Sequence, residues 1–189
     1  MSGYIGSKAV NLSTTGADIN GDAIVDGTLD VLGAATGTDL TLSGGLYVGG
    51  AVAANYLDDY EEGEWTPSVK FGGGEVGIAY ALRRGTYTKI GDVVTVQGYT
   101  AFSNKGSSVG SVTIQGLPFN ANSLSGSFSN ITLWINNVTF ADYPQGYITV
   151  GTSNVLFGEI LNSGGATTTL TNTNFVNTSE VMFTVVYRV

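Results

Sequence analysis

The chain has 189 residues, of which 15 are acidic and 7 are basic, and its formal net charge is -8 at pH 7. This charge disfavours nucleic acids and anionic membranes as partners, because proteins bind both through basic surfaces. The sequence contains no cysteine and no histidine, which excludes disulfides, thiolate nucleophiles, histidine-based triads and nearly all zinc, copper and iron sites. We therefore expect no cofactor. No run approaches the roughly 20 apolar residues that span a bilayer, so we expect no membrane insertion.

The composition favours an all-β protein. Glycine is frequent, with 28 residues, and proline is rare, with three, while serine, threonine, asparagine and valine occur throughout. Short strands joined by glycine and asparagine turns have this composition. Convincing helical periodicity is absent from the sequence, and we predict many short antiparallel strands.

Residues 21–57 are predicted to form a short stalk. Very short apolar pairs alternate with polar residues there, at Leu29/Val31, Leu40/Leu42 and Leu46/Val48. Strands of this length cannot close a core with their own neighbours, since isolated two-stranded pieces are marginal in water. We expect these apolar stripes to be buried against copies of the chain, in an intertwined trimeric β-stalk. The acidic residues Asp18 and Asp22 half resemble a calcium loop, but Ala23 and Leu29 replace its required glycine and its bidentate acid, so solvated turns are favoured.

An acidic run follows the predicted stalk. It contains Asp58, Asp59, Glu61, Glu62 and Glu64, and Trp65-Thr66-Pro67 comes directly after it. The run allows three interpretations: paired acids for glycoside hydrolysis, a weak divalent-cation site where three chains meet, or a charged junction that leads into a domain. The flanking residues favour the junction, with Lys70, Arg83 and Arg84 as candidate partners of the acids.

Residues 58–189 are predicted to form an antiparallel β-sandwich head, jelly-roll-like in type. A turn at Gly91-Asp92 precedes an alternating segment that places Val94 and Val96 on one face. The closing segment alternates in the same way, and five of its side chains share a face: Val181, Phe183, Val185, Tyr187 and Val189. The glycines of 72–77 fit the spacing of a dinucleotide-binding loop, but strand-like sequence follows them, which favours a hairpin loop.

Aromatic residues mark the candidate binding site. The segment 136–147 is expected to be a loop, and it concentrates side chains that stack on sugar rings or bind their hydroxyl groups. These candidate residues are Phe140, Asp142, Tyr143, Gln145 and Tyr147. The alternative is that the rings only close the end of the sandwich.

Three motifs in residues 57–120 resemble the C-terminal domains of tail-fibre-like proteins of bacteriophages of aquatic bacteria and cyanobacteria. They are the acidic "DDYEEGEWTP", the segment "GTYTKIGDVVTVQG" and the later "GLPF", in that order. The N-terminal "GYIGSK" also resembles the start of phage fibre proteins. "ADINGDAIVDGTLDVLG" resembles their short stalk repeats.

The resemblance implies a homotrimeric virion protein exposed on the phage particle. Residues 1–20 would attach it to a tail or baseplate protein, with Tyr4, Ile5 and Lys8 as candidate contacts. The head would bind a host surface polysaccharide without catalysis, and three heads would add avidity. Two alternatives stay open: a decoration or cement protein attached to the capsid, and a glycan hydrolase.

Overall fold

The computed structural model describes residues 26, 31–42, 46–47, 56–57, 59–160 and 165–189. The chain divides into two units, Met1–Thr41 and Leu42–Val189. The predicted attachment segment 1–20, with Tyr4, Ile5 and Lys8, lies outside the described residues, as does most of the predicted stalk. Within the described part of the chain, no helix has the length and hydrophobicity needed to cross a bilayer.

Among the described residues of the predicted stalk, strands occur at 46–47 and 56–57. Residues 39–42 have no regular secondary structure in the single chain, and the strand predicted there against copies of the chain stays a prediction. Strand β1 (Leu46–Tyr47) pairs antiparallel with β2 (Tyr56–Leu57) of the same chain. Leu32 and Leu40 are 96% and 78% exposed. Such short apolar segments form stable strands, with their apolar face covered, only when further strands lie beside them. The intertwined trimeric stalk stays a prediction.

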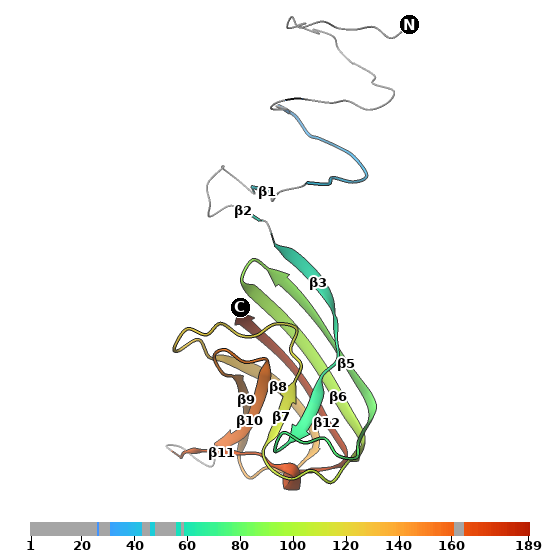
Figure 1. Cartoon of the computed structure of the whole chain (residues 1–189), viewed down its shortest axis with the longest axis vertical. Helices are drawn as coiled ribbons and strands as arrows, with labels where there is room; N and C mark the ends of the chain where they lie inside the picture. The colour runs from blue at the N-terminus through green and yellow to red at the C-terminus, as the bar shows by residue number, and fades with distance from the viewer. Residues whose placement is uncertain (1–25, 27–30, 43–45, 48–55, 58, 161–164) are drawn as a thin grey trace, which may run out of the picture. The chain divides into compact units, whose positions relative to one another are not determined.

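The head is one curled antiparallel sheet, whose strands appear in Figure 1. Its strands and one 3₁₀ turn are β3 (Tyr60–Trp65), β4 (Ser68–Phe71), β5 (Ile78–Ile90), β6 (Val93–Lys105), β7 (Val112–Gln115), β8 (Ser129–Val138), β9 (Tyr143–Ile148), β10 (Asn154–Ile160), β11 (Thr167–Thr169), η2 (Asn172–Asn174) and β12 (Phe175–Arg188). The strand order is β3-β5-β6-β12-β8-β9-β10-β7-β4, and β11 pairs with β10. The predicted all-β, antiparallel architecture is confirmed.

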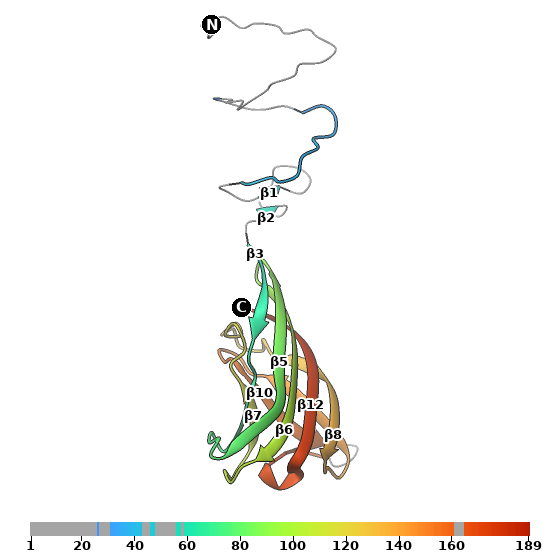
Figure 2. The same cartoon turned by 90° about the vertical axis from the view of Figure 1, so that its right-hand side faces the viewer.

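The sheet forms two walls that share β8. Most of β8 pairs with β12, whereas its first residues, Ser129 and Asn130, pair with β9. The long wall therefore contains β3, β5, β6, β12 and β8, and the short wall contains β9, β10, β7 and β4 with β11. Figure 2 shows the long strands of the long wall side by side. Because the sheet folds back on itself, one face of each wall is buried and the other is exposed.

The core lies between the walls and follows the predicted alternation. Val94 and Val96 of β6 are fully buried, and the predicted inward side chains of β12 are at most 3% exposed from Val181 to Tyr187. The short wall contributes Ile114, Ile148 and other fully buried side chains. Gly91, with a φ of 58°, forms the predicted turn between β5 and β6. The glycines of 72–77 lie in the connection from β4 to β5, as expected for a loop.

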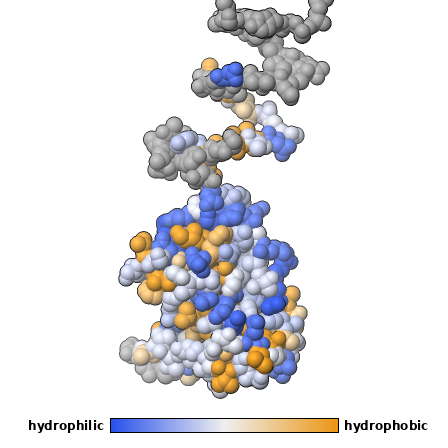
Figure 3. Space-filling model, viewed as in Figure 1, coloured by the Kyte–Doolittle hydropathy of each residue, from blue (hydrophilic) through white to orange (hydrophobic). Residues whose placement is uncertain are grey.

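The surface of the head mixes polar and apolar side chains. In the view of Figure 3, apolar side chains form several separate patches among polar ones. Large apolar side chains that are at least 44% exposed occur on both the loops and the strands. Exposed aromatic and aliphatic groups of this kind mark the places where binding to another molecule is worth testing.

Candidate functional site

The predicted binding residues fall partly in a loop and partly in a strand. Phe140 and Asp142 lie between β8 and β9, as expected, but Tyr143, Gln145 and Tyr147 belong to β9. The interpretation of the whole segment 136–147 as a loop is therefore wrong at both ends, because 136–138 belong to β8 and the residues from Tyr143 onward belong to β9. A strand was not expected there because the segment contains Pro144. Proline has no N–H group to donate to a neighbouring strand, so within sheets it is confined to positions where that hydrogen bond is not needed. Only the last two residues of β9 pair with β8, so at Pro144 the edge of β9 that faces β8 is not paired with it.

Three of the predicted residues share the outer face of β9. Gly146 and Ile148 are buried, so the alternating residues Tyr143, Gln145 and Tyr147 face outward. Tyr143 is 73% exposed. Gln145 Nε2 donates a hydrogen bond of 3.4 Å to Thr167 Oγ1 of β11. The ring of Tyr147 lies 6.3 Å from that of Phe128, centroid to centroid.

Hydrogen bonds fix the backbone of the loop that carries Phe140. On one side, the Thr139 amide donates to the Asn174 carbonyl oxygen at 2.8 Å, and Asn174 Nδ2 donates to the Thr139 carbonyl oxygen at 2.7 Å. On the other side, the Ala141 amide donates to Glu159 Oε2 at 2.6 Å, and the Glu159 side chain is largely buried. Phe140 is nevertheless 44% exposed. The loop therefore presents an aromatic ring on an ordered backbone.

The five predicted residues carry the kinds of side chain that bind sugars elsewhere. We call Phe140, Asp142, Tyr143, Gln145 and Tyr147 the β9 site. Exposed rings offer flat apolar area at a low cost in side-chain entropy, and nearby amide and carboxylate groups accept or donate hydrogen bonds. A backbone that is already ordered lowers the entropy cost of binding.

Three acids of the acidic run, Glu61, Glu62 and Glu64, lie in β3 at the edge of the sheet, and the role of the run as a junction between stalk and head stays a prediction. Residues 60–65 form β3 and pair with β5, so that Glu61 lies opposite Lys89 and Glu64 opposite Thr86. Glu64 forms an ion pair with Arg84, one of the predicted partners. Arg83 instead lies over the Tyr80 ring, 4.7 Å from its centroid. Charged side chains on an edge strand discourage pairing with a strand of another molecule.

Sequence reasoning missed the main partner of the acidic run. Lys89 Nζ forms an ion pair with Asp59 and lies 4.0 Å from Glu61 Oε1. The Lys89 side chain is only 9% exposed, and its Nζ lies 5.7 Å from the centroid of the Phe119 ring. Among the described residues, which exclude Asp58, no group of three or more acidic side chains is arranged to hold a metal ion. The predicted weak cation site on a trimer axis stays a prediction.

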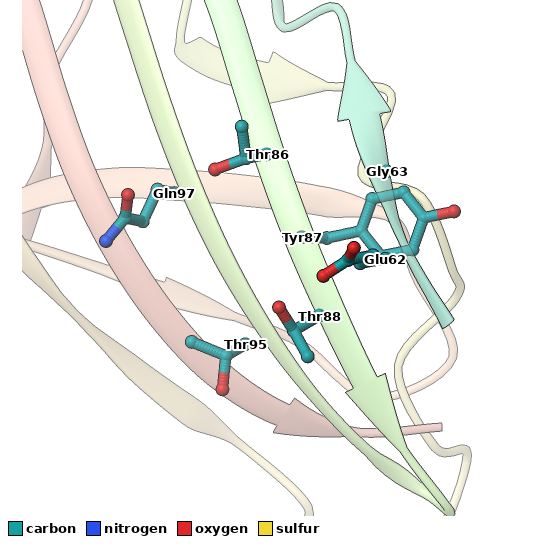
Figure 4. Close-up of a pocket in the computed structure, with 7 residues that line it drawn as sticks. All are labelled: Glu62, Gly63, Thr86, Tyr87, Thr88, Thr95 and Gln97. Atoms are coloured by element: carbon teal, nitrogen blue, oxygen red, sulfur yellow. The ribbon is translucent and has the colours of Figure 1, made fainter. Parts of the chain in front are cut away.

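The outer face of the long wall carries a groove that sequence reasoning also missed. One hollow of about 490 Å³ is lined by Glu62, Thr86, Thr88, Thr95 and Gln97, among others. Figure 4 shows these side chains on β3, β5 and β6. A second hollow of about 340 Å³ shares Thr86 and Gln97 with the first and reaches Tyr99 and Met182. Only the strand register brings these residues together, so no local motif indicates the groove.

Comparisons with known proteins support the fold alone. No protein-family model matches the sequence, and no curated protein matches it. The crystal structure of Dettilon tailspike protein (gp208) is similar, with a TM-score of 0.57 and 16% sequence identity. The similarity covers 68% of this chain and 24% of that chain. The matched part is thus about a quarter of the tailspike, and it shows that the same β architecture occurs in a phage protein.

Proposed function

We propose that this chain is a surface protein of a bacteriophage tail whose head binds a host-cell polysaccharide without cleaving it. The observation that carries the proposal is the exposed pair Phe140 and Tyr143, beside a loop backbone that Asn174 and Glu159 fix in place. The fold of the head, which resembles part of a tailspike protein, supports a location on the phage tail. In this proposal residues 1–20 attach the chain to the tail or baseplate.

The proposed assembly is a homotrimer. The exposed Leu32 and Leu40 side chains support this, because copies of the chain would bury them. Three heads on one stalk would also compensate for weak single sites, since the second and third binding events become intramolecular.

Labelling of intact phage particles tests the location. An antibody against residues 121–189 should label the tail tip or baseplate in electron micrographs. Label spread over the head of the particle would overturn the tail assignment and would favour a capsid decoration protein.

An array of bacterial surface polysaccharides tests the binding site. The full chain should bind at least one polysaccharide, and the double variant F140A/Y143A should bind it at least tenfold more weakly. Val109→Ala is the matched control, since Val109 is 74% exposed and lies outside the β9 site. Equal binding by F140A/Y143A and the wild type would exclude the β9 site as the receptor contact.

A further inference from the structure

Two parallel rows of side chains cross the outer face of the long wall. The strand register places Arg84, Tyr99, Met182 and Trp134 opposite one another on β5, β6, β12 and β8. It likewise aligns Thr86, Gln97, Thr184 and Thr132 in the adjacent row. Both rows point outward, because Val181, Phe183 and Val185 of β12 point into the core.

Apart from Arg84, which is paired with Glu64, the first row consists of the large side chains Tyr99, Met182 and Trp134. Trp134 and Met182 are each 47% exposed, although they lie on the strands β8 and β12 rather than on a loop. The Tyr99 hydroxyl donates a hydrogen bond of 2.7 Å to Glu180 Oε2, which fixes the direction of its ring. The row therefore offers flat apolar surface whose geometry is set by the sheet.

Apart from Glu64 at its β3 end, the second row is polar and uncharged. Thr86 and Gln97 line both hollows of the groove, and Thr184 lines the second. Glu64, at the β3 end of this row, is paired with Arg84. Hydroxyl and amide groups both donate and accept hydrogen bonds, so they match the hydroxyl groups of a neutral sugar. The surplus of acidic groups in the chain disfavours an anionic glycan.

Core side chains pack closely beneath the floor of the groove. Gly85 and Gly98 lie opposite each other on β5 and β6 and line the second hollow. The rings of Trp65 and Phe183 press against them from the core side: a Cβ atom on Gly85 would lie 2.1 Å from Trp65 Nε1, and one on Gly98 would lie 2.5 Å from Phe183. A supported floor of this kind keeps both rows in place before a ligand binds.

We propose that this face is a second glycan-binding surface, which takes a stretch of neutral polysaccharide laid across the strands. Sugar rings stack on Trp134, Met182 and Tyr99, and their hydroxyl groups bind Thr86, Gln97 and Thr184. Neighbouring strands are about 4.8 Å apart, so a chain laid across them meets a new side chain at each strand. Each of the two hollows is of the size that ligand sites have, about 300 to 1,000 Å³. This inference rests on the proposed function and extends it from one site to two.

Tryptophan fluorescence can report on this face alone, because one of the two tryptophans lies on it and the other is buried. The chain has two tryptophans, and Trp65 is 8% exposed whereas Trp134 is 47% exposed. Quenching by iodide should therefore report on Trp134. We expect iodide to quench the free full-length protein and a saturating neutral polysaccharide from the array to reduce this quenching at least twofold. If iodide fails to quench the free protein, another copy of the chain covers the face and the proposal is wrong.

Variants test the two rows separately. Trp134→Ala should weaken binding of that polysaccharide at least tenfold, and Thr184→Val, which keeps the side-chain shape, should weaken it several-fold. The melting temperature of Thr184→Val should match the wild type, because the change lies on the surface. F140A/Y143A is the control for the β9 site: it should lower affinity but, at saturating polysaccharide, leave the protection of Trp134 unchanged.

The outcomes distinguish the two proposals. Binding by the wild type that neither Trp134→Ala nor Thr184→Val reduces would overturn the second surface and leave the proposed function in place. A wild-type protein that binds no polysaccharide on the array would overturn both.

Discussion

Trp65 Nε1 donates a hydrogen bond to the backbone carbonyl oxygen of Gln97 at 3.0 Å. These residues belong to β3 and β6, which are separated in the sheet by β5. The Trp65 ring therefore crosses the inner side of β5 at Gly85, and it meets the Phe183 ring edge-on with centroids 6.1 Å apart. Trp65, the last residue of β3, thus anchors this strand to the core.

This relationship predicts that Gly85 tolerates no side chain. A Cβ atom at Gly85 would lie 2.1 Å from Trp65 Nε1, so Gly85→Ala must displace the indole ring. We expect the free energy of unfolding to fall by about 1 to 3 kcal/mol, as in other overpacked cores, in urea titrations of the full chain. Gly33→Ala is the control, because no atom lies within 4 Å of the added Cβ there. Equal stability of the two variants would contradict the close packing of Trp65.

The ion pair between Asp59 and Lys89 should stabilise the start of the head. Lys89 is largely buried, so removing one partner leaves a charge that is poorly compensated, whereas removing both does not. A double-mutant cycle with Asp59→Asn and Lys89→Met should give a coupling energy of about 0.5 to 3 kcal/mol.

The exposed pair Glu64 and Arg84 provides the comparison for that cycle. Their side chains are 66% and 65% exposed, so Glu64→Gln and Arg84→Met should couple by less than about 1 kcal/mol. A larger coupling for this exposed pair than for Asp59 and Lys89 would show that burial of Lys89 does not matter.

Tyr187 should make the head sensitive to alkali. Burial raises the pKa of Tyr187 from 10.0 to about 12, against the opposing effect of its hydrogen bond to the Phe119 carbonyl oxygen. Below pH 10 both the folded and the unfolded chain keep the proton. Between pH 10 and 12 only the unfolded chain loses it, so stability should fall by up to about 1.4 kcal/mol per pH unit.

Tyr187→Phe tests this effect. The variant loses the hydrogen bond, which should cost about 1 kcal/mol at neutral pH, but it has no proton to release. Its unfolding free energy should therefore decline less steeply above pH 10 than that of the wild type. Tyr143→Phe, at an exposed position, should follow the wild-type curve. Parallel curves for Tyr187→Phe and the wild type would contradict the assignment.

Glu159 should control the order of the loop that carries Phe140. Its carboxylate accepts the Ala141 amide at 2.6 Å, and hydrogen bonds to charged groups contribute about 1.5 to 3 kcal/mol. Glu159→Ala should therefore speed hydrogen exchange of the Ala141 amide by about 10- to 100-fold. Glu159→Gln retains an acceptor oxygen and should exchange close to the wild-type rate. If Glu159→Ala leaves this rate unchanged, the carboxylate does not fix the loop.

Much of the head could be predicted from local pattern. The alternation in β6 and β12 identified Val94, Val96 and the inward residues from Val181 to Tyr187, because a half-buried strand has a period of two. The turn at Gly91 was also local, since glycine supplies a positive φ at no steric cost. These features depend on neighbouring residues in the sequence.

Features that depend on strand register could not be predicted. Lys89 meets Asp59 and Glu61 only because β3 and β5 pair antiparallel in one register, and Trp134 meets Met182 only because β12 lies between β6 and β8. A shift of one residue would move each side chain to the other face. Tyr143, Gln145 and Tyr147 could be named as candidates from their side-chain types, but the strand that aligns Tyr143 with Tyr147 was not expected in a segment that contains Pro144.

The most direct test of the account is to measure binding and cleavage of the same polysaccharide. The full-length protein would be incubated with a polysaccharide that it retains on the array, and both the bound fraction and the number of newly formed reducing ends would be followed over time. If the head binds without cleaving, binding is saturable, with no increase in reducing ends and no loss of polysaccharide length. Steady release of reducing ends would contradict it and would show that the chain is a glycan hydrolase.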